Sequence, residues 1–334
     1  MQNVVPALGA RQTRIRSFGQ TVTLVIGKYG AIMVLALLFA WFSVAAKYFL
    51  TWDNSVQILN QAALSAISAC GLTLVLASNQ FDLSVGNTAS LSGIVVAMLM
   101  INGVPIPIAI AAALGVGVAI GLCNSFLVAY RKVNALVATL GVGSAAVGVN
   151  YFLSGGAAQP FAFAAPAFNQ ISIGNWLGIP KNVYYMVAIV VVLWALLNRT
   201  VLGRNIQAVG GNAEAARLAG VGTMSVTSAA FIICSLCAAV TGILLASVVG
   251  SGQPTGGDGY TMTAFAAAFL GTAVLREGQF HIVGTVVGVL TVAVGFNGLT
   301  LIGVPSYVQF FFQGVLLIAA VSFSTVARQH SKAS

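Results

Sequence analysis

Long apolar runs, separated by short polar or Gly/Pro-containing connections, follow one another from about residue 30 to residue 327. A helix needs about 20 consecutive apolar residues to cross the hydrocarbon layer of a bilayer. The pattern therefore predicts an all-α fold, a polytopic membrane helical bundle of about ten transmembrane helices. The predicted spans are residues 30–50, 58–77, 84–102, 106–130, 133–153, 183–199, 225–249, 261–275, 281–301 and 306–327.

Composition supports the membrane assignment. Of the 334 residues, 59% are hydrophobic and only 6% are charged, against roughly a quarter charged in an ordinary soluble domain. With a mean hydropathy of +0.98, the chain cannot be a water-soluble globular protein.

Fourteen basic and five acidic residues give a net charge of +9, and most of the basic residues lie in the connections. If the amino terminus is cytoplasmic, twelve of them face the cytoplasm and only Lys47 and Lys181 face outward. This is the distribution of the positive-inside rule, and it accounts for the charge without nucleic acid. It predicts that both termini are cytoplasmic. The cytoplasmic set is Arg11, Arg14, Arg16, Lys28, Arg131, Lys132, Arg199, Arg204, Arg217, Arg276, Arg328 and Lys332.

The predicted organisation is a single transmembrane domain over residues 30–327, between a cytoplasmic segment 1–29 and a cytoplasmic tail 328–334. Residues 154–182 form a periplasmic loop with three prolines and several aromatic residues. Residues 200–224 form the longest cytoplasmic connection, in which AEAARLAG at 213–220 predicts a short helix that ends at a glycine. The similar sequences INGVP at 101–105 and LIGVP at 301–305 suggest parallel three-helix repeats.

Ionisable side chains are missing from the middle of the predicted spans. Asp53, Asp82, Glu214, Asp258 and Glu277 all fall at span ends or in connections. A proton- or sodium-driven carrier normally needs a buried carboxylate or an unwound ion site. We therefore expect no catalytic residue and no metal site, and we expect transport energy to come from another subunit unless the protein is a passive pore.

Uncharged polar side chains do occur within the spans. Amides offer both hydrogen-bond donors and acceptors, so they can line a wet path for a polyhydroxyl solute, or they can bond neighbouring helices together. Both interpretations stay open. The candidates for the translocation path are Asn60, Gln61, Thr73, Asn150, Asn297 and Gln309, and the same spans also hold Asn124 and Gln313.

Three stretches give a specific resemblance to a known family. The first is GLTLVLASNQFDLSVG at 71–86 and the second is LGRNIQAVGGNAEAARLAG at 202–220. The third runs from QPTGGDGY at 253–260 through the glycines at 284 and 288 to Asn297. Over about residues 50–325 the chain resembles the membrane-spanning permease subunit of bacterial carbohydrate ABC importers, of the ribose, xylose and arabinose type in the branched-chain amino acid permease-like superfamily.

The resemblance implies a function and partners. It implies import of a sugar or sugar-like polar solute across the bacterial cytoplasmic (inner) membrane, with a passive polyol channel as the alternative. The expected partners are the lipid bilayer, a second permease copy or paralogue, a cytoplasmic ATP-binding subunit and a periplasmic sugar-binding protein. ATP and Mg would be bound by the ATP-binding subunit, so we expect no cofactor on this chain and no enzymatic activity of its own.

The resemblance also assigns roles to residues. The second stretch matches the loop that docks as a coupling helix into the ATP-binding subunit, which implies ATPase coupling by Arg204, Gly211, Asn212, Glu214, Arg217 and Gly220. Asp82 is either a gate acid or, as we favour, the cap of the third span. The turn at 271–281 departs from the family, because charged residues replace several of the expected glycines.

Overall fold

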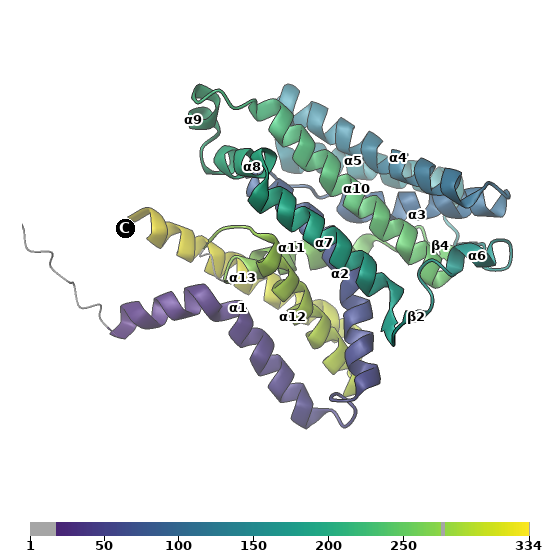
Figure 1. Cartoon of the computed structure of the whole chain (residues 1–334), viewed down its shortest axis with the longest axis horizontal. Coiled ribbons are helices and arrows are strands. Elements are labelled where there is room, and N and C mark those ends of the chain that lie inside the picture. The colour runs from purple at the N-terminus through teal and green to yellow at the C-terminus, as the bar shows by residue number, and fades with distance from the viewer. Residues whose placement is uncertain (1–17, 275–277, 334) are drawn as a thin grey trace, which may run out of the picture.

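The computed structural model describes residues 18–274 and 278–333, with side chains for residues 29–274 and 278–322. Most of the predicted amino-terminal segment, the side chains of the carboxyl-terminal tail, Arg276 and Glu277 therefore lie outside the described residues. The structure confirms a helical membrane bundle (Figure 1). Its ten long helices are α1 (Phe18–Ala45), α2 (Trp52–Ala77), α3 (Val85–Ile101), α4 (Ile106–Ser125), α5 (Ala135–Ser154), α7 (Lys181–Arg199), α10 (Thr223–Val249), α11 (Asp258–Gly271), α12 (Ile282–Leu301) and α13 (Tyr307–Ala333).

Among the described residues, six helices are long and apolar enough to cross a membrane: α2, α4 with its π-helical extension η1 (Phe126–Tyr130), α5, α7, α10 and α12. Shorter apolar helices lie within α1, α3 and α13. Helix α11 has 14 residues, and it begins and ends a few residues earlier than the predicted span 261–275. The short helix predicted at 213–220 is α9 (Ala213–Leu218), but the preceding α8 (Val201–Gly211) was not predicted.

The two ends of the bundle carry different short elements. One end holds β1 (Gln159–Pro160), α6 (Pro166–Asn169), β2 (Asn175–Trp176), β3 (Ile179–Pro180) and β4 (Ser251–Gly252), with β1 paired to β4 and β2 to β3. Helices α8 and α9 lie at the opposite end (Figure 1). The predicted periplasmic loop and the predicted coupling segment therefore lie at opposite ends of the bundle.

Helix α10 lies at the centre and packs on α2, α3 and α4. Glycines make these contacts close, because a glycine has no Cβ and so lets a neighbouring backbone approach. A Cβ on Gly117 would lie 2.8 Å from the Ser235 carbonyl oxygen, and one on Gly121 would lie 2.7 Å from the Cα of Ile232. A Cβ on Gly242 of α10 would collide with the Ala89 carbonyl of α3.

The contacts contradict the expected parallel repeats, in which α2 and α3 correspond to α11 and α12, because α11 packs closely on α12 whereas α2 barely touches α3. Helices α2 and α10 run antiparallel, because Ser68 bonds to Thr241 while Gly71, further along α2, meets the earlier Cys234 and Cys237. The contacts within α2–α5 and α10–α13 correspond if α2 is matched with α10, α3 with α11, α4 with α12 and α5 with α13. Helices α3 and α4 pack on α10, and their counterparts α11 and α12 pack on α2. Helix α5 packs on α3, and its counterpart α13 packs on α11. The segments α2–α5 and α10–α13 therefore have the arrangement of inverted repeats.

The similar sequences at 101–105 and 301–305 form the same kind of turn. After α3 and after α12, a glycine with positive φ (Gly103 at 71°, Gly303 at 76°) ends the helix, and the next amide bonds back five residues. A positive φ favours glycine, and a proline two residues later starts the next helix. Similar turn chemistry produced similar sequences at positions that the inverted arrangement does not relate.

Candidate functional site

Helix α8 is held firmly against the end of the bundle. Thr200 caps it, with its hydroxyl accepting a hydrogen bond from the Gly203 amide at 3.1 Å, and Ile206 and Val209 are buried. At Gly210, a Cβ would collide with the Ala77 carbonyl at the end of α2. Movement of α8 must therefore be transmitted to α2.

Helix α9 is short and mostly exposed. The Asn212 side chain caps it by accepting a hydrogen bond from the Ala215 amide at 2.9 Å, and Gly220 ends it with a φ of +84°. Only Ala216 of this helix is buried. The other side chains of α9 are available to a partner.

A charged pair lies on this exposed helix. Arg217 donates to Glu214 at 2.6 Å, with 62% and 67% of the two side chains exposed. The hydrogen bond and the charge of Arg217 lower the pKa of Glu214, so Glu214 stays ionised at neutral pH. Arg204 is exposed on neighbouring α8. The six predicted coupling residues thus lie on one continuous segment, α8–α9.

Sequence reasoning missed the positions that fix this segment, Thr200, Gly203 and Gly210. A threonine three residues before the Gly203 amide is a helix-start signal that predicts α8. The close approach of Gly210 to α2 has no signal in the local sequence.

The predicted path residues fall into two groups. Thr73 bonds to Thr285 at 2.7 Å, Asn150 donates to the Pro254 carbonyl at 2.7 Å, and Asn297 donates to Asn54 at 2.8 Å. All three side chains are buried. Asn60 accepts from Asn182 at 3.2 Å. These four side chains make hydrogen bonds between separate segments of the bundle.

Gln61 and Gln309 form the second group. Together with Gln313 they line one hollow of about 220 Å³ between α2, α11, α12 and α13. Gln313 donates to Thr263 at 2.8 Å, and Gln309 donates to Thr300 at 3.0 Å. The structure therefore brings three amides from sequence-distant helices to one hollow, whose other lining residues include Tyr260, Phe296 and Phe310.

Asp82 is fully buried, which its position between two apolar runs did not reveal. Its Oδ1 accepts hydrogen bonds from the Ser84 amide at 2.9 Å, from the Ser84 hydroxyl at 2.6 Å and from Asn124 at 3.4 Å. Ser84 occupies the cap position of α3. Asp82 therefore does not cap α3 as we expected; it joins the α2–α3 connection to α4.

A helical bundle of this kind, with a firmly attached exposed segment at one end and three amides around one hollow, is typical of a multi-pass membrane transport subunit. Residues 54–321 match the family described as the permease component of the branched-chain amino acid transport system. The chain belongs to this family.

Curated relatives extend over nearly the whole chain. The ribose import permease protein RbsC of Escherichia coli (strain K12) is 37% identical over 87% of this chain and 91% of its own length. The L-arabinose transport system permease protein AraH of the same organism is 34% identical over 89% and 90%. The D-allose transport system permease protein AlsC is 33% identical over 88% and 90%. No solved structure matches the chain.

Proposed function

We propose that this chain is the membrane-spanning permease subunit of an ATP-driven importer for a sugar or sugar-like polar solute. The observation that supports this most strongly is that relatives named for ribose, arabinose and allose transport align over nine-tenths of their length. Family membership favours the importer over a passive polyol channel.

The exposed α8–α9 segment is the proposed contact with a cytoplasmic ATP-binding subunit, which would bind ATP and Mg. Small alanines on α9 allow close approach, and the Glu214–Arg217 pair offers charges of both signs to a partner. Because α8 is locked to α2, α7 and α10, a push on this segment would move the bundle as a whole.

The translocation path is proposed to include the hollow that holds Gln61, Gln309 and Gln313. It adjoins α13, whose outer face exposes the apolar side chains of Phe310, Phe311, Val315 and Ile318. An apolar face of this kind suits lipid or a second permease copy. A periplasmic sugar-binding protein would meet the opposite end, near residues 154–182.

The test is reconstitution in liposomes. Uptake of the solute should require the ATP-binding subunit, ATP and the binding protein together, because the one buried carboxylate among the described residues, Asp82, lies in the α2–α3 connection and outside the spanning helices, where it is hydrogen-bonded to Ser84. Liposomes that contain this chain alone are the control. Rapid solute flux in the control would reject the importer and favour the channel.

Orientation has its own test. In a Cys123→Ser background, Gln170→Cys should react with a membrane-impermeant maleimide on intact cells, whereas Ala219→Cys should react only after the cells are opened. Both positions are exposed, at opposite ends of the bundle (Figure 1). Reaction in the reverse order would overturn the proposed topology.

A further inference from the structure

A cavity of about 570 Å³ opens beside the α8–α9 segment. Four parts of the chain surround it: the connection after α2, the connection between η1 and α5, the junction of α8 with α9, and the first turn of α10. Its volume lies within the range of small-molecule sites. The importer proposed above does not use this cavity.

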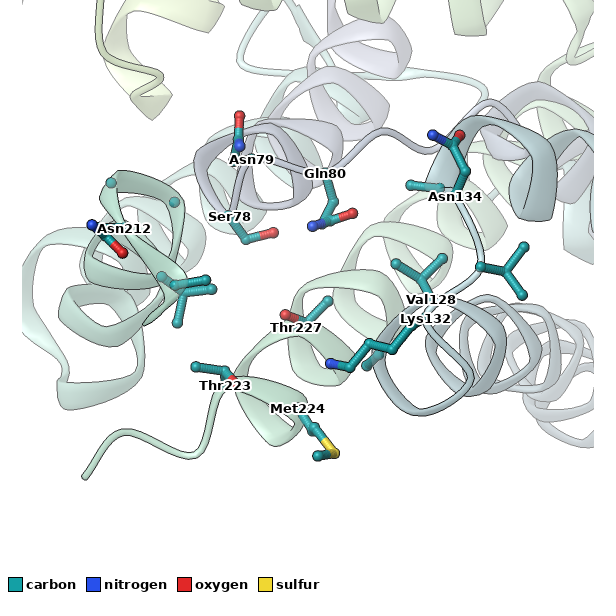
Figure 2. A pocket seen from close by; sticks show the side chains of 17 residues that line it. Ser78, Asn79, Gln80, Val128, Lys132, Asn134, Asn212, Thr223, Met224 and Thr227 are labelled. Carbon is teal, nitrogen blue, oxygen red and sulfur yellow. The ribbon is translucent and has the colours of Figure 1, made fainter. Parts of the chain in front are cut away.

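The lining mixes polar and apolar residues and carries a positive charge. Gln80, Asn134 and Asn212 all line the cavity, with the Oδ1 atoms of the two asparagines capping α5 and α9, and Lys132 is the charged side chain among the lining residues. Within the described part of the chain, the Lys132 ammonium has no ion-pair or hydrogen-bond partner. Figure 2 shows the side chains of Gln80, Lys132 and Thr227 converging on the same space.

Thr227 adds a hydroxyl to the lining. Its side chain is only 6% exposed, and among the described residues its hydroxyl has no hydrogen-bond partner and faces the cavity (Figure 2). The hydroxyl oxygen is reachable from the cavity, so a ligand there can donate a hydrogen bond to it or accept one from it.

The helix ends around the cavity offer both hydrogen-bond donors and acceptors. Helix α10 starts at Thr223 without a side-chain cap, so its first amide hydrogens and its dipole favour a negative group there. The last residues of α8, Gly210 and Gly211, line the other side, and carbonyl groups at the end of a helix lack partners within that helix. Hydroxyl groups match such a mixed lining because each one both donates and accepts.

We propose that this cavity binds a small polyhydroxylated solute that carries an anionic group, of the sugar phosphate or sugar acid class. The anionic group lies between Lys132 and the start of α10, and the hydroxyls meet Thr227 and the surrounding amides. The proposal rests on the proposed function for its cytoplasmic location and its physiological meaning.

Occupancy of this cavity has a mechanical consequence. The ligand bridges Asn212, at the start of α9, to Lys132 and Gln80, which belong to other parts of the bundle. It therefore clamps the coupling segment in one position. By holding the coupling segment, a phosphorylated or oxidised derivative of an imported sugar would slow further import of that sugar.

Isothermal titration of the purified permease measures binding with four probes: D-ribose 5-phosphate, D-gluconate, inorganic phosphate and D-ribose. We expect at least one of the first two to bind saturably, and about tenfold more tightly than D-ribose and inorganic phosphate. Lys132→Gln should weaken this binding about tenfold, because a charge-assisted bond is lost. Thr227→Val, which keeps the shape of the side chain, should weaken it about threefold. Lys47→Gln removes the same charge from an exposed residue outside the cavity and should change nothing.

Reconstituted transport supplies the second measurement. The bound probe, added on the ATPase side, should reduce ATP-driven uptake with wild-type permease and leave Lys132→Gln uninhibited. The proposal is overturned if no probe binds saturably, or if Lys132→Gln binds as tightly as wild type. Weaker ATPase association in Lys132→Gln, without any probe binding, would assign the cavity to a protein contact instead. Solute flux without an ATPase would reject the importer while leaving the binding isotherm valid.

Discussion

Glu214→Lys should abolish ATP-driven uptake while leaving the permease folded. The substitution removes the partner of Arg217 and places two positive charges one helical turn apart on the exposed α9. If α9 binds to the ATP-binding subunit, the new lysine loses water and faces groups of that subunit that match a negative charge. The affinity between the two subunits should therefore fall at least about tenfold. Co-purification of the ATP-binding subunit and stimulated ATP hydrolysis measure the effect.

The matched control is Asp53→Lys, the same charge reversal on an exposed residue at the start of α2. It should keep ATPase association at the wild-type level. Thermal unfolding of Glu214→Lys should also match wild type, because the side chain has no buried contact. If the ATP-binding subunit co-purifies and is stimulated normally while uptake fails, α9 is not the coupling element.

Gly257→Ala should strongly destabilise the protein. Gly257 lies at the start of α11, where its amide donates to the Ser90 hydroxyl at 2.8 Å and where a Cβ would collide with the Gly86 carbonyl of α3. The contact is reciprocal, because a Cβ on Gly86 would lie 2.5 Å from the Gly257 carbonyl oxygen. Backbone on both sides cannot yield as a side chain would, so we expect a loss of about 2–3 kcal/mol or more.

Gly259→Ala, two residues further along the same helix, is the control. Nothing lies within 4 Å of a Cβ at this position, so alanine should be neutral or stabilise the helix by up to about 1 kcal/mol. Thermal unfolding in detergent compares the two variants. Equal unfolding temperatures for both would show that the crossing of α3 and α11 is not tightly packed.

The number and approximate position of the long helices were predictable because a bilayer imposes a similar length on every apolar run that crosses it. The sequence was less informative where that constraint does not act. Helix α8 contains Gly203, Gly210 and Gly211, which lower helix propensity, and tertiary contacts with α2 and α7 stabilise it. The inverted arrangement depends on which helices touch, and a local similarity of turns pointed to parallel repeats instead.

In the candidate site, too, features with a local sequence signal were predictable and features that depend on tertiary contacts were not. The end of α9 was predictable because helix-forming alanines followed by glycine are a local signal. The role of Asp82 was not, because its burial follows from Asn124 on α4 and from the path of the chain after α2. Among the amides, nothing local separates Asn150, bonded to Pro254, from Gln61, which lines a hollow.

The glycine contacts around α10 restrict how the helices of this protein can move relative to one another. Where two backbones touch across Gly242 and Ala89, or across Gly121 and Ile232, sliding one helix along the other would bring a side chain into space that holds only a hydrogen atom. Helices α2, α3, α4 and α10 must therefore turn together as one block. Helix α9 joins that block through α8 on one side and through residues 219–222 on the other. A push on α9 would therefore tilt the block, and we expect α1, α5 and α13, which lie outside it, to be the helices that change neighbours.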